Sequence, residues 1–357
     1  MKMKKIKIAI IGQGRSGRDI HGKFFKSENN DIIEVAAVVE ANEDRRKRAL
    51  KEYPGCKVYE SYKEILDMDF DLVVNASYSH MHYPITKELL ENGFNVLCEK
   101  PFARNYYECT DLIKTAKENN CILTVFHQSN SSPFFMHAKE VYNSGKLGDI
   151  LQINIKYNGF SRRWDWQTLQ TMVAGSLYNT GPHPVGMVLD LLGYDNNTRV
   201  AYSKLDKALT FGDAEDFVKI ILDTPNKPLA DIEIHSTDAY SDYNIKLIGT
   251  KGTYKCTLGE YKMKYVADGE NPDREVVRDT LVNEEGFPVF CSEDLKTHEE
   301  TDKFNGSPFD VGTEDFYRHL YASVMDGKEL FVKPENIAKV ISIMETVHGQ
   351  NPMSVEF

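Results

Sequence analysis

The chain has 357 residues, of which 41% are hydrophobic and 27% are charged, a composition that fits a soluble globular protein with room for two domains. It carries 43 Lys and Arg against 54 Asp and Glu, and the resulting net charge of −11 argues against nucleic acid or an anionic membrane as partner. Because no apolar run is long enough for a membrane span or a signal peptide, we expect a cytoplasmic protein.

In the first third, continuous apolar runs alternate with amphipathic helical patterns, which is typical of a parallel sheet covered on both faces. The expected strands are Lys5–Ile11, Ile32–Val39, Lys57–Tyr59, Asp71–Ala76, Asn95–Cys98 and Ile122–Phe126. The expected helices are Gly17–Phe25, Asn42–Glu52, Tyr83–Asn92 and Asn105–Asn119. We therefore predict an α/β, doubly wound domain of the Rossmann type over residues 1–128.

The pattern changes after residue 128. A helix over Pro133–Ser144 is followed by strands with clear alternation, which predicts an α+β domain over residues 129–357 with a large, open, mainly antiparallel sheet. These strands include Leu151–Tyr157, Phe217–Leu222, Ala230–Ser236, Asn244–Gly249 and Gly252–Cys256. The acidic stretch Asp268–Asn305 is expected to be a long surface excursion. Two last helices, Gly312–Met325 and Pro334–Gly349, are placed to pack back on the first domain.

One face of this open sheet must be covered by helices, and the other could line a substrate cleft or pair with another copy. We expect a homo-oligomer, a dimer or larger. The six cysteines have no C-x-x-C spacing, so we predict reduced thiols without disulfides, and we expect no metal site.

A glycine-rich motif, Gly12-Gln13-Gly14-Arg15-Ser16-Gly17, lies between the first strand and the first helix. In this G-x-G-x-x-G arrangement the first glycine permits a tight turn, the second lets the backbone approach a pyrophosphate, and the third lets helix pack on strand. The helix N-terminus offers free N–H groups to the phosphates.

Glu40 ends the second strand, where a carboxylate can accept both ribose hydroxyls and would repel a 2′-phosphate. NAD is therefore expected as the cofactor, with NADP less favoured. Arg45 and Arg46 follow closely, and we interpret them as part of a solvated helix face with Glu43 and Asp44.

Three further segments carry a family resemblance. They are Glu99-Lys100-Pro101, Asn179-Thr180-Gly181-Pro182-His183 with Gly175 before it, and Ser77-Tyr78-Ser79 with His82. In this order behind the glycine motif, they make nearly the whole chain resemble the glucose–fructose oxidoreductase, inositol dehydrogenase and MocA (Gfo/Idh/MocA) family.

The resemblance implies roles for these residues. It makes Lys100 the lysine that contacts the nicotinamide ribose and the reacting hydroxyl, where an ammonium stabilises the developing oxyanion. It makes His183 the base that takes the hydroxyl proton, and a position near a helix N-terminus would keep the imidazole neutral. Asn179 completes the expected catalytic set. The expected cofactor contacts are Gly12, Gly14, Arg15, Ser16, Gly17, Glu40, Ser77, His82, Glu99, Lys100 and Gln128.

The chain departs from the commonest family pattern at two positions. Asn179 stands where the family usually has an aspartate, and Gly186 stands where an acid usually follows the histidine. An amide can hydrogen-bond a sugar hydroxyl but cannot relay a proton by titrating. The proton path must then depend on His183 and Lys100, with or without water.

Both tryptophans of the chain lie in Arg162-Arg163-Trp164-Asp165-Trp166. Aromatic faces stack on sugar rings and Arg reaches hydroxyls, so this segment indicates a polyol or glycoside substrate, although a structural aromatic cluster is an equal alternative. The expected substrate contacts are Arg162, Arg163, Trp164, Tyr157, Tyr178 and Asn179. His235 and Tyr240 are weaker candidates.

The sequence thus predicts an NAD-dependent oxidoreductase acting on a secondary alcohol of a sugar, cyclitol or glycoside, with C3 of a glucoside as the favoured guess. Two alternatives stay open. One is a redox-neutral enzyme that retains its NAD and cleaves glycosides or exchanges electrons between sugars. The other is a catalytically silent regulator that binds NAD or sugar.

Overall fold

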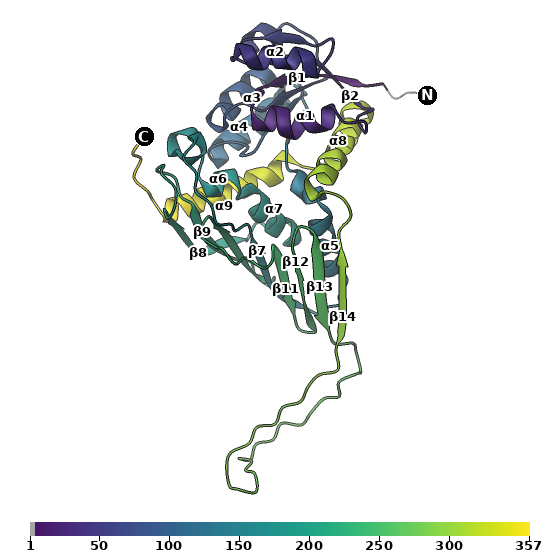
Figure 1. Cartoon of the computed structure of the whole chain (residues 1–357), viewed down its shortest axis with the longest axis vertical. Helices are drawn as coiled ribbons and strands as arrows, with labels where there is room; N and C mark the ends of the chain where they lie inside the picture. The colour runs from purple at the N-terminus through teal and green to yellow at the C-terminus, as the bar shows by residue number, and fades with distance from the viewer. Residues whose placement is uncertain (1–3) are drawn as a thin grey trace.

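The computed structural model describes residues 4–357. Among these residues, six parallel strands form a sheet in the order β3–β2–β1–β4–β5–β6. This part of the chain, with β1 and β2 labelled, lies at the top of Figure 1. The strands are β1 (Ile6–Ile11), β2 (Ile33–Val39), β3 (Lys57–Tyr59), β4 (Leu72–Asn75), β5 (Val96–Cys98) and β6 (Leu123–Val125). The helices between them are η1 (Arg15–His21) continued by α1 (Gly22–Phe25), α2 (Glu43–Glu52), η2 (Tyr62–Ile65), η3 (Ser79–Met81), α3 (His82–Glu91) and α4 (Tyr106–Glu118). The predicted Rossmann sheet is confirmed, and its strand order reverses between β1 and β4, where ligands bind in such sheets.

A second sheet has eight strands within the described residues, in the order β14–β13–β12–β11–β7–β10–β9–β8. The strands are β7 (Ile150–Lys156), β8 (Arg199–Asp206), β9 (Phe217–Asp223), β10 (Leu229–His235), β11 (Ile245–Gly249), β12 (Gly252–Cys256), β13 (Glu260–Tyr265) and β14 (His298–Lys303). The β7–β10 pair is parallel and the other neighbouring pairs in this sheet, as described, are antiparallel. The predicted open, mainly antiparallel sheet is therefore confirmed.

Helices cover one face of this second sheet, because α5 and α7 pack on its central strands. The helices and turns of this region are η4 (Gln128–Ser131), α5 (Pro133–Asn143), η5 (Trp166–Thr168), η6 (Gln170–Met172), α6 (Ser176–Asn179) and α7 (Pro182–Leu191). On β9, β10 and β12 the buried side chains point to the helices, and charged side chains point away from them.

Three strands were not predicted, namely β8, β13 and β14. We expected a surface excursion over Asp268–Asn305. This prediction is wrong for its last part, because His298–Lys303 pairs with β13 as an edge strand. This segment, His-Glu-Glu-Thr-Asp-Lys, contains no aliphatic residue, so hydrophobic alternation could not reveal it.

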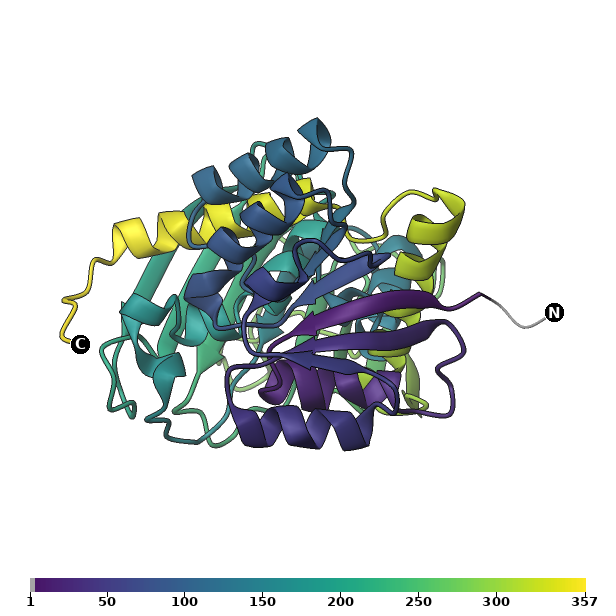
Figure 2. The same ribbon diagram turned by 90° about the horizontal axis from the view of Figure 1, so that it is seen from above.

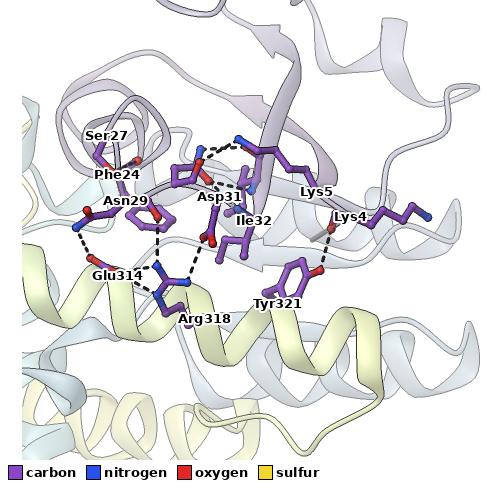
Figure 3. Close-up of polar contacts among 12 residues, drawn as sticks. Lys4, Lys5, Phe24, Ser27, Asn29, Asp31, Ile32, Glu314, Arg318 and Tyr321 are labelled. Carbon is purple, nitrogen blue, oxygen red and sulfur yellow. Dashed lines mark hydrogen bonds and ion pairs between the residues drawn. The ribbon is translucent and has the colours of Figure 1, made fainter. Parts of the chain in front are cut away.

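The two C-terminal helices, α8 (Pro308–Asp326) and α9 (Pro334–Gln350), contact the first sheet's layers. Helix α9 runs beside α4 (Figure 2), and α8 packs against α1. Polar contacts reinforce the α8 side (Figure 3): Arg318 bonds to Asp31 at 3.2 Å, and the Tyr321 hydroxyl donates to the Lys4 carbonyl oxygen at 2.8 Å.

All six cysteines are free, and Cys291 is exposed. Between residues 4 and 357, none of the helices combines the length and the apolar character that crossing a bilayer requires.

Candidate active site

The glycine-rich turn after β1 has the contacts that its motif predicts. Gly12 has φ of +94°, and a Cβ atom there would collide with the carbonyl oxygen of Ala76. A Cβ atom on Gly17 would collide with the carbonyl oxygen of Gly12, so Gly17 lets the helix pack on the turn. A Cβ atom on Gly14 would meet nothing within 4 Å, and this open space lies at the N-terminus of the continuous η1–α1 helix. Open space and free N–H groups together fit a dinucleotide pyrophosphate.

The Glu40 carboxylate lies beside this turn. It accepts hydrogen bonds from the backbone N–H groups of Gln13 at 2.8 Å and Asn42 at 3.0 Å. The two arginines behind it do not form the solvated face that we expected: Arg46 donates to the Glu40 carbonyl oxygen at 2.6 Å, and Arg45 lies 3.5 Å from the Glu40 carboxylate. Cations at this strand end weaken the preference for NAD over NADP that the carboxylate alone would give.

The remaining residues predicted to contact the cofactor differ in accessibility. Arg15 is exposed and Ser16 half-buried in the first turn of η1. Ser77 lies after β4, and its hydroxyl donates to the Asn75 side chain at 2.7 Å. Gln128 is buried, and its Oε1 has no hydrogen-bond partner within the described chain.

His82 and Glu99 are both buried, and each contacts other parts of the protein. His82 is buried, with Nδ1 2.7 Å from the Pro101 carbonyl oxygen. Glu99 Oε1 lies 3.1 Å from His21 Nε2, and the Tyr317 hydroxyl lies 2.6 Å from His21 Nδ1. Burial would raise the pKa of Glu99, but contact with His21 brings it below its ordinary value. These contacts connect α8 through the first helix to the end of β5 and thereby position the neighbouring lysine.

Lys100 extends from the carboxyl end of β5 to the second sheet's helices. Its Nζ donates a hydrogen bond of 2.7 Å to the main-chain carbonyl oxygen of Asn179. Burial lowers the pKa of Lys100, while the charge of Glu99 acts in the opposite direction. The ammonium is therefore held in place with donors left over for a ligand oxygen.

The Asn179 side chain is held through its amide nitrogen only. Its Nδ2 donates to the Gln167 carbonyl oxygen at 2.7 Å, while Oδ1 is buried without a hydrogen-bond partner in residues 4–357. An orphaned buried acceptor is uncommon. The amide oxygen is thus available for a donor that a ligand would supply.

His183 is the second residue of α7, as expected for a histidine near a helix N-terminus. Its Nδ1 lies 2.9 Å from the Ser129 hydroxyl oxygen, and its ring stacks on those of His127 and Tyr157. Burial lowers the pKa of His183 well below its usual value, and the charges of Lys100 and His127 add to this effect. His183 is therefore a neutral imidazole at physiological pH, and the positive charge of Lys100 helps to keep it neutral.

His127 occupies the place of the missing family acid. A Cβ atom on Gly186 would collide with the His127 ring, so this position of α7 accepts no side chain. His127 Nε2 lies 2.7 Å from the Pro182 carbonyl oxygen, and burial lowers its pKa to about 4. A neutral imidazole thus packs on the catalytic candidate where a carboxylate is common in the family.

Gly186→Ala is expected to destabilise the protein by about 1–3 kcal/mol, because the new methyl group displaces the His127 ring in a packed core. Gly349→Ala on α9 is the matched control, since its Cβ atom would have open space. Urea unfolding measures both. Equal stability of the two variants would contradict the packing role assigned to Gly186.

A cavity of about 280 Å³ lies next to Asn179 and is walled mostly by polar groups. Its lining residues are Tyr157, Asn158, Gly159, Ser161, Arg163, Gln167, Thr168, Ser176, Asn179, Thr180, Thr210, Glu215, Asp216, Ile234, His235 and Ser236. Of the residues predicted to contact substrate, Tyr157, Arg163 and Asn179 are in this set, and so is the weaker candidate His235.

The other predicted substrate residues lie elsewhere. Trp164 is 74% exposed, and Tyr240 is 93% exposed. The Arg162 guanidinium lies 4.9 Å from the Phe211 ring centroid. Tyr178 is buried, and its hydroxyl donates to a main-chain carbonyl oxygen at 2.6 Å. Neither tryptophan is among the lining residues of the cavity as described, so its walls are mostly polar and do not contain the tryptophan platform that was one of our two interpretations.

Glu215 is a cavity residue that the sequence reasoning missed. Its Oε1 accepts a hydrogen bond of 2.8 Å from the Leu177 N–H, and the residue is 3% exposed. Burial raises the pKa of Glu215 to about 7. Glu215 precedes β9, far from every motif, and only the contact of this loop with α6 brings it to the site.

Glu215→Gln is expected to reduce the pH dependence of stability. The folded pKa of about 7 exceeds the ordinary value of 4.5, so burial of the neutral acid costs little at low pH, and stability is lost as pH rises through 7. At roughly 1.4 kcal/mol per pKa unit, the wild type should lose a few kcal/mol between pH 5 and pH 8. Glu60→Gln, at an exposed carboxyl, is the control. Identical pH profiles of unfolding for wild type and Glu215→Gln would refute this assignment.

Two comparisons of sequence bear on this site. The model of an oxidoreductase family with an NAD-binding Rossmann fold matches residues 6–127, and a GFO/IDH/MocA C-terminal domain model matches residues 135–255. The chain belongs to the GFO/IDH/MocA oxidoreductase family. The family resemblance of the motifs is thereby confirmed.

Two relatives in sequence and one solved structure illustrate what this chain is similar to. A 2,7-anhydro-N-acetylneuraminate hydratase of Mediterraneibacter gnavus is 25% identical over 72% of this chain and 68% of that protein. A scyllo-inositol 2-dehydrogenase (NADP(+)) of Bacillus subtilis is 27% identical over 54% of this chain and 53% of its own length. An NAD-binding protein from Listeria innocua has a TM-score of 0.79 at 22% identity, with 98% of both chains covered, and shares the fold.

Proposed function

We propose that this protein is an NAD-dependent oxidoreductase that transfers a hydride between a secondary alcohol of a sugar, cyclitol or glycoside and nicotinamide. The observation that carries the proposal is the pairing of a neutral His183 with Lys100 beside a polar cavity. The glycine turn, Glu40 and Ser77 would hold the cofactor.

The two side chains have complementary tasks. His183 Nε2 takes the proton of the substrate hydroxyl, and the resulting imidazolium donates through Nδ1–H to the Ser129 hydroxyl oxygen 2.9 Å away. The Lys100 ammonium donates to the same substrate oxygen as negative charge develops on it. Its bond to the Asn179 carbonyl oxygen keeps it oriented for this role.

The cavity favours a substrate with several hydroxyl groups. Asn179 Oδ1 offers a free acceptor, Arg163 offers donors, and Glu215 supplies a buried carboxyl. Among such substrates we favour a glucoside oxidised at C3. The named relatives, one a cyclitol dehydrogenase and one acting on an anhydro-sugar acid, support this class.

A redox-neutral reaction with retained NAD is the second candidate. It is favoured by the relative named as a hydratase, whose name describes no net oxidation. NAD itself is favoured over NADP by the Glu40 carboxylate, although the nearby arginines reduce this preference.

Absorbance of reduced nicotinamide at high enzyme concentration tests the proposal. The enzyme is mixed with a pool of glycosides, cyclitols and aldoses, with and without added NAD or NADP. A signal that keeps rising only with added NAD is the expected result, whereas a burst that stops at the enzyme concentration indicates the retained-cofactor reaction. Absence of any signal from protein that binds NAD would contradict both.

The uncovered face of the second sheet supports a further proposal, that the protein forms a homo-oligomer. Isologous pairing of identical faces would remove the exposed part of this sheet from water.

A further inference from the structure

A long segment projects from the second sheet. Residues 267–297, here called the arm, connect β13 to β14 and extend away from the body of the protein (Figure 1). The arm is held by contacts within itself: the Val289 N–H donates to the Leu281 carbonyl oxygen at 3.0 Å, and Arg274 pairs with Glu293. From residue 272 to 297 every side chain except Leu281 is exposed.

The arm exposes seven large apolar side chains. Its exposed large apolar side chains are Val276, Val277, Val282, Phe287, Val289, Phe290 and Leu295. Phe290 is 91% and Val276 85% exposed. Clustered apolar side chains of this kind mark surfaces that bind another protein surface.

The arm is also strongly acidic, with nine Asp and Glu against three Lys and Arg. Several of its carboxylates, among them Asp279, Glu284 and Glu285, form no ion pair in residues 4–357. A surface that is complementary to the arm would therefore be basic and partly apolar.

The same chain presents such a surface on the uncovered side of the second sheet. Lys246, Lys255 and Lys262 are cross-strand neighbours on β11, β12 and β13, and we call them the lysine row. They point away from the helices, because the alternate residues Leu247, Tyr254 and Met263 are buried and α5 packs on β11 and β12. Like charges directly opposite one another destabilise a sheet.

Little within the chain neutralises this row. Lys255 bonds to Asp242 at 2.9 Å, but Lys246 and Lys262 have no ion-pair partner among residues 4–357. Ile248 lies on the same face, in register with Gln152 of β7, and adds apolar surface. The lysine row thus has the positive charge that the arm lacks, and it lies beside some apolar surface.

We propose that the arm of one copy clasps the lysine row of a second copy, and that the second copy's arm returns the same contact. The arm leads away from its own sheet, so a second molecule supplies the surface that covers it. An isologous pair of this kind makes the contact twice. This proposal deepens the homo-oligomer proposed above and does not depend on the reaction.

Charge reversal with complementation tests the clasp. The row variant carries Lys246→Glu, Lys255→Glu and Lys262→Glu, and the arm variant carries Asp279→Lys, Glu284→Lys and Glu285→Lys. Each alone is expected to weaken association at least 10-fold by sedimentation at low salt. Mixed together, they should associate again, because each then meets an oppositely charged surface.

The matched control reverses three exposed acids away from the arm, and its variant carries Glu28→Lys, Glu91→Lys and Glu118→Lys. It should associate like the wild type. A wild type that is monomeric, variants that associate normally, or a mixture that fails to associate would each overturn the proposal. NAD binding by every variant, measured separately, shows that the proteins are folded.

Cross-linking supplies an independent measurement. Cys291 is exposed next to Phe290 and can carry a photoreactive label. The label should join the arm of one copy to the β11–β13 peptides of another, recognised by mixing light and heavy-isotope protein, and Cys291→Ser removes the signal. Cross-links found only within one chain would contradict the clasp.

Discussion

Lys100→Met is expected to lower kcat by roughly 10²–10³-fold while NAD still binds, because methionine keeps the apolar stem and removes the donors that stabilise the oxyanion. The bond from Lys100 Nζ to the Asn179 carbonyl oxygen is lost as well, so the substrate oxygen loses its oriented cation. Stopped-flow measurement of reduced nicotinamide gives kcat, and isothermal titration gives the affinity for NAD.

The exposed Lys117→Met is the control and should leave kcat unchanged. In the wild type, burial lowers the pKa of Lys100, so kcat/KM should fall on the alkaline side at a pH below 10.5, as the ammonium loses its proton. If Lys100→Met keeps more than a tenth of the wild-type kcat, Lys100 does not stabilise the oxyanion.

His183→Gln is expected to lower kcat for alcohol oxidation by about 10²–10⁴-fold, since the general base is removed. In the wild type, burial keeps the pKa of His183 well below 6.5, and only the neutral imidazole accepts a proton. The rate should therefore stay constant as pH falls to 6.5 and decline only at lower pH.

The pH profile distinguishes a base from a structural residue. In His183→Gln the acidic decline assigned to the imidazole should disappear from the residual rate, whereas His319→Gln, at an exposed histidine of α8, should keep the wild-type profile. An unchanged acidic decline in His183→Gln would show that another group titrates there.

Local geometry made the nucleotide-binding half predictable. The positive φ of Gly12 belongs to the turn directly after β1, and Gly17 meets Gly12 five residues away, although Gly12 also packs against Ala76 at the end of the neighbouring strand. Continuous apolar runs and helix ends are short-range features, so the order of strands and helices up to residue 128 could be derived from sequence alone. Lys100 at the end of β5 followed from the same pattern.

The pocket depended on contacts that sequence spacing does not contain. Trp164 has the chemistry of a sugar platform but lies exposed, and Tyr178 faces a main-chain carbonyl group, because tertiary packing decides where a side chain points. Glu215 reaches the cavity only because the loop before β9 packs on α6. His127 fills the space beside Gly186 from a different part of the chain.

The sequence by itself therefore determined the fold class and the nucleotide-binding turn, because these depend mainly on neighbours along the chain, whereas the two residues proposed for catalysis were assigned through the family resemblance. Only the tertiary structure decided that two imidazoles stack where an acid is usual, that a buried carboxyl lines the cavity, and that an acidic arm projects beyond a basic sheet face. These features arise where segments that are distant in the sequence come into contact. The surroundings of each side chain there determine whether it is buried and whether it is charged.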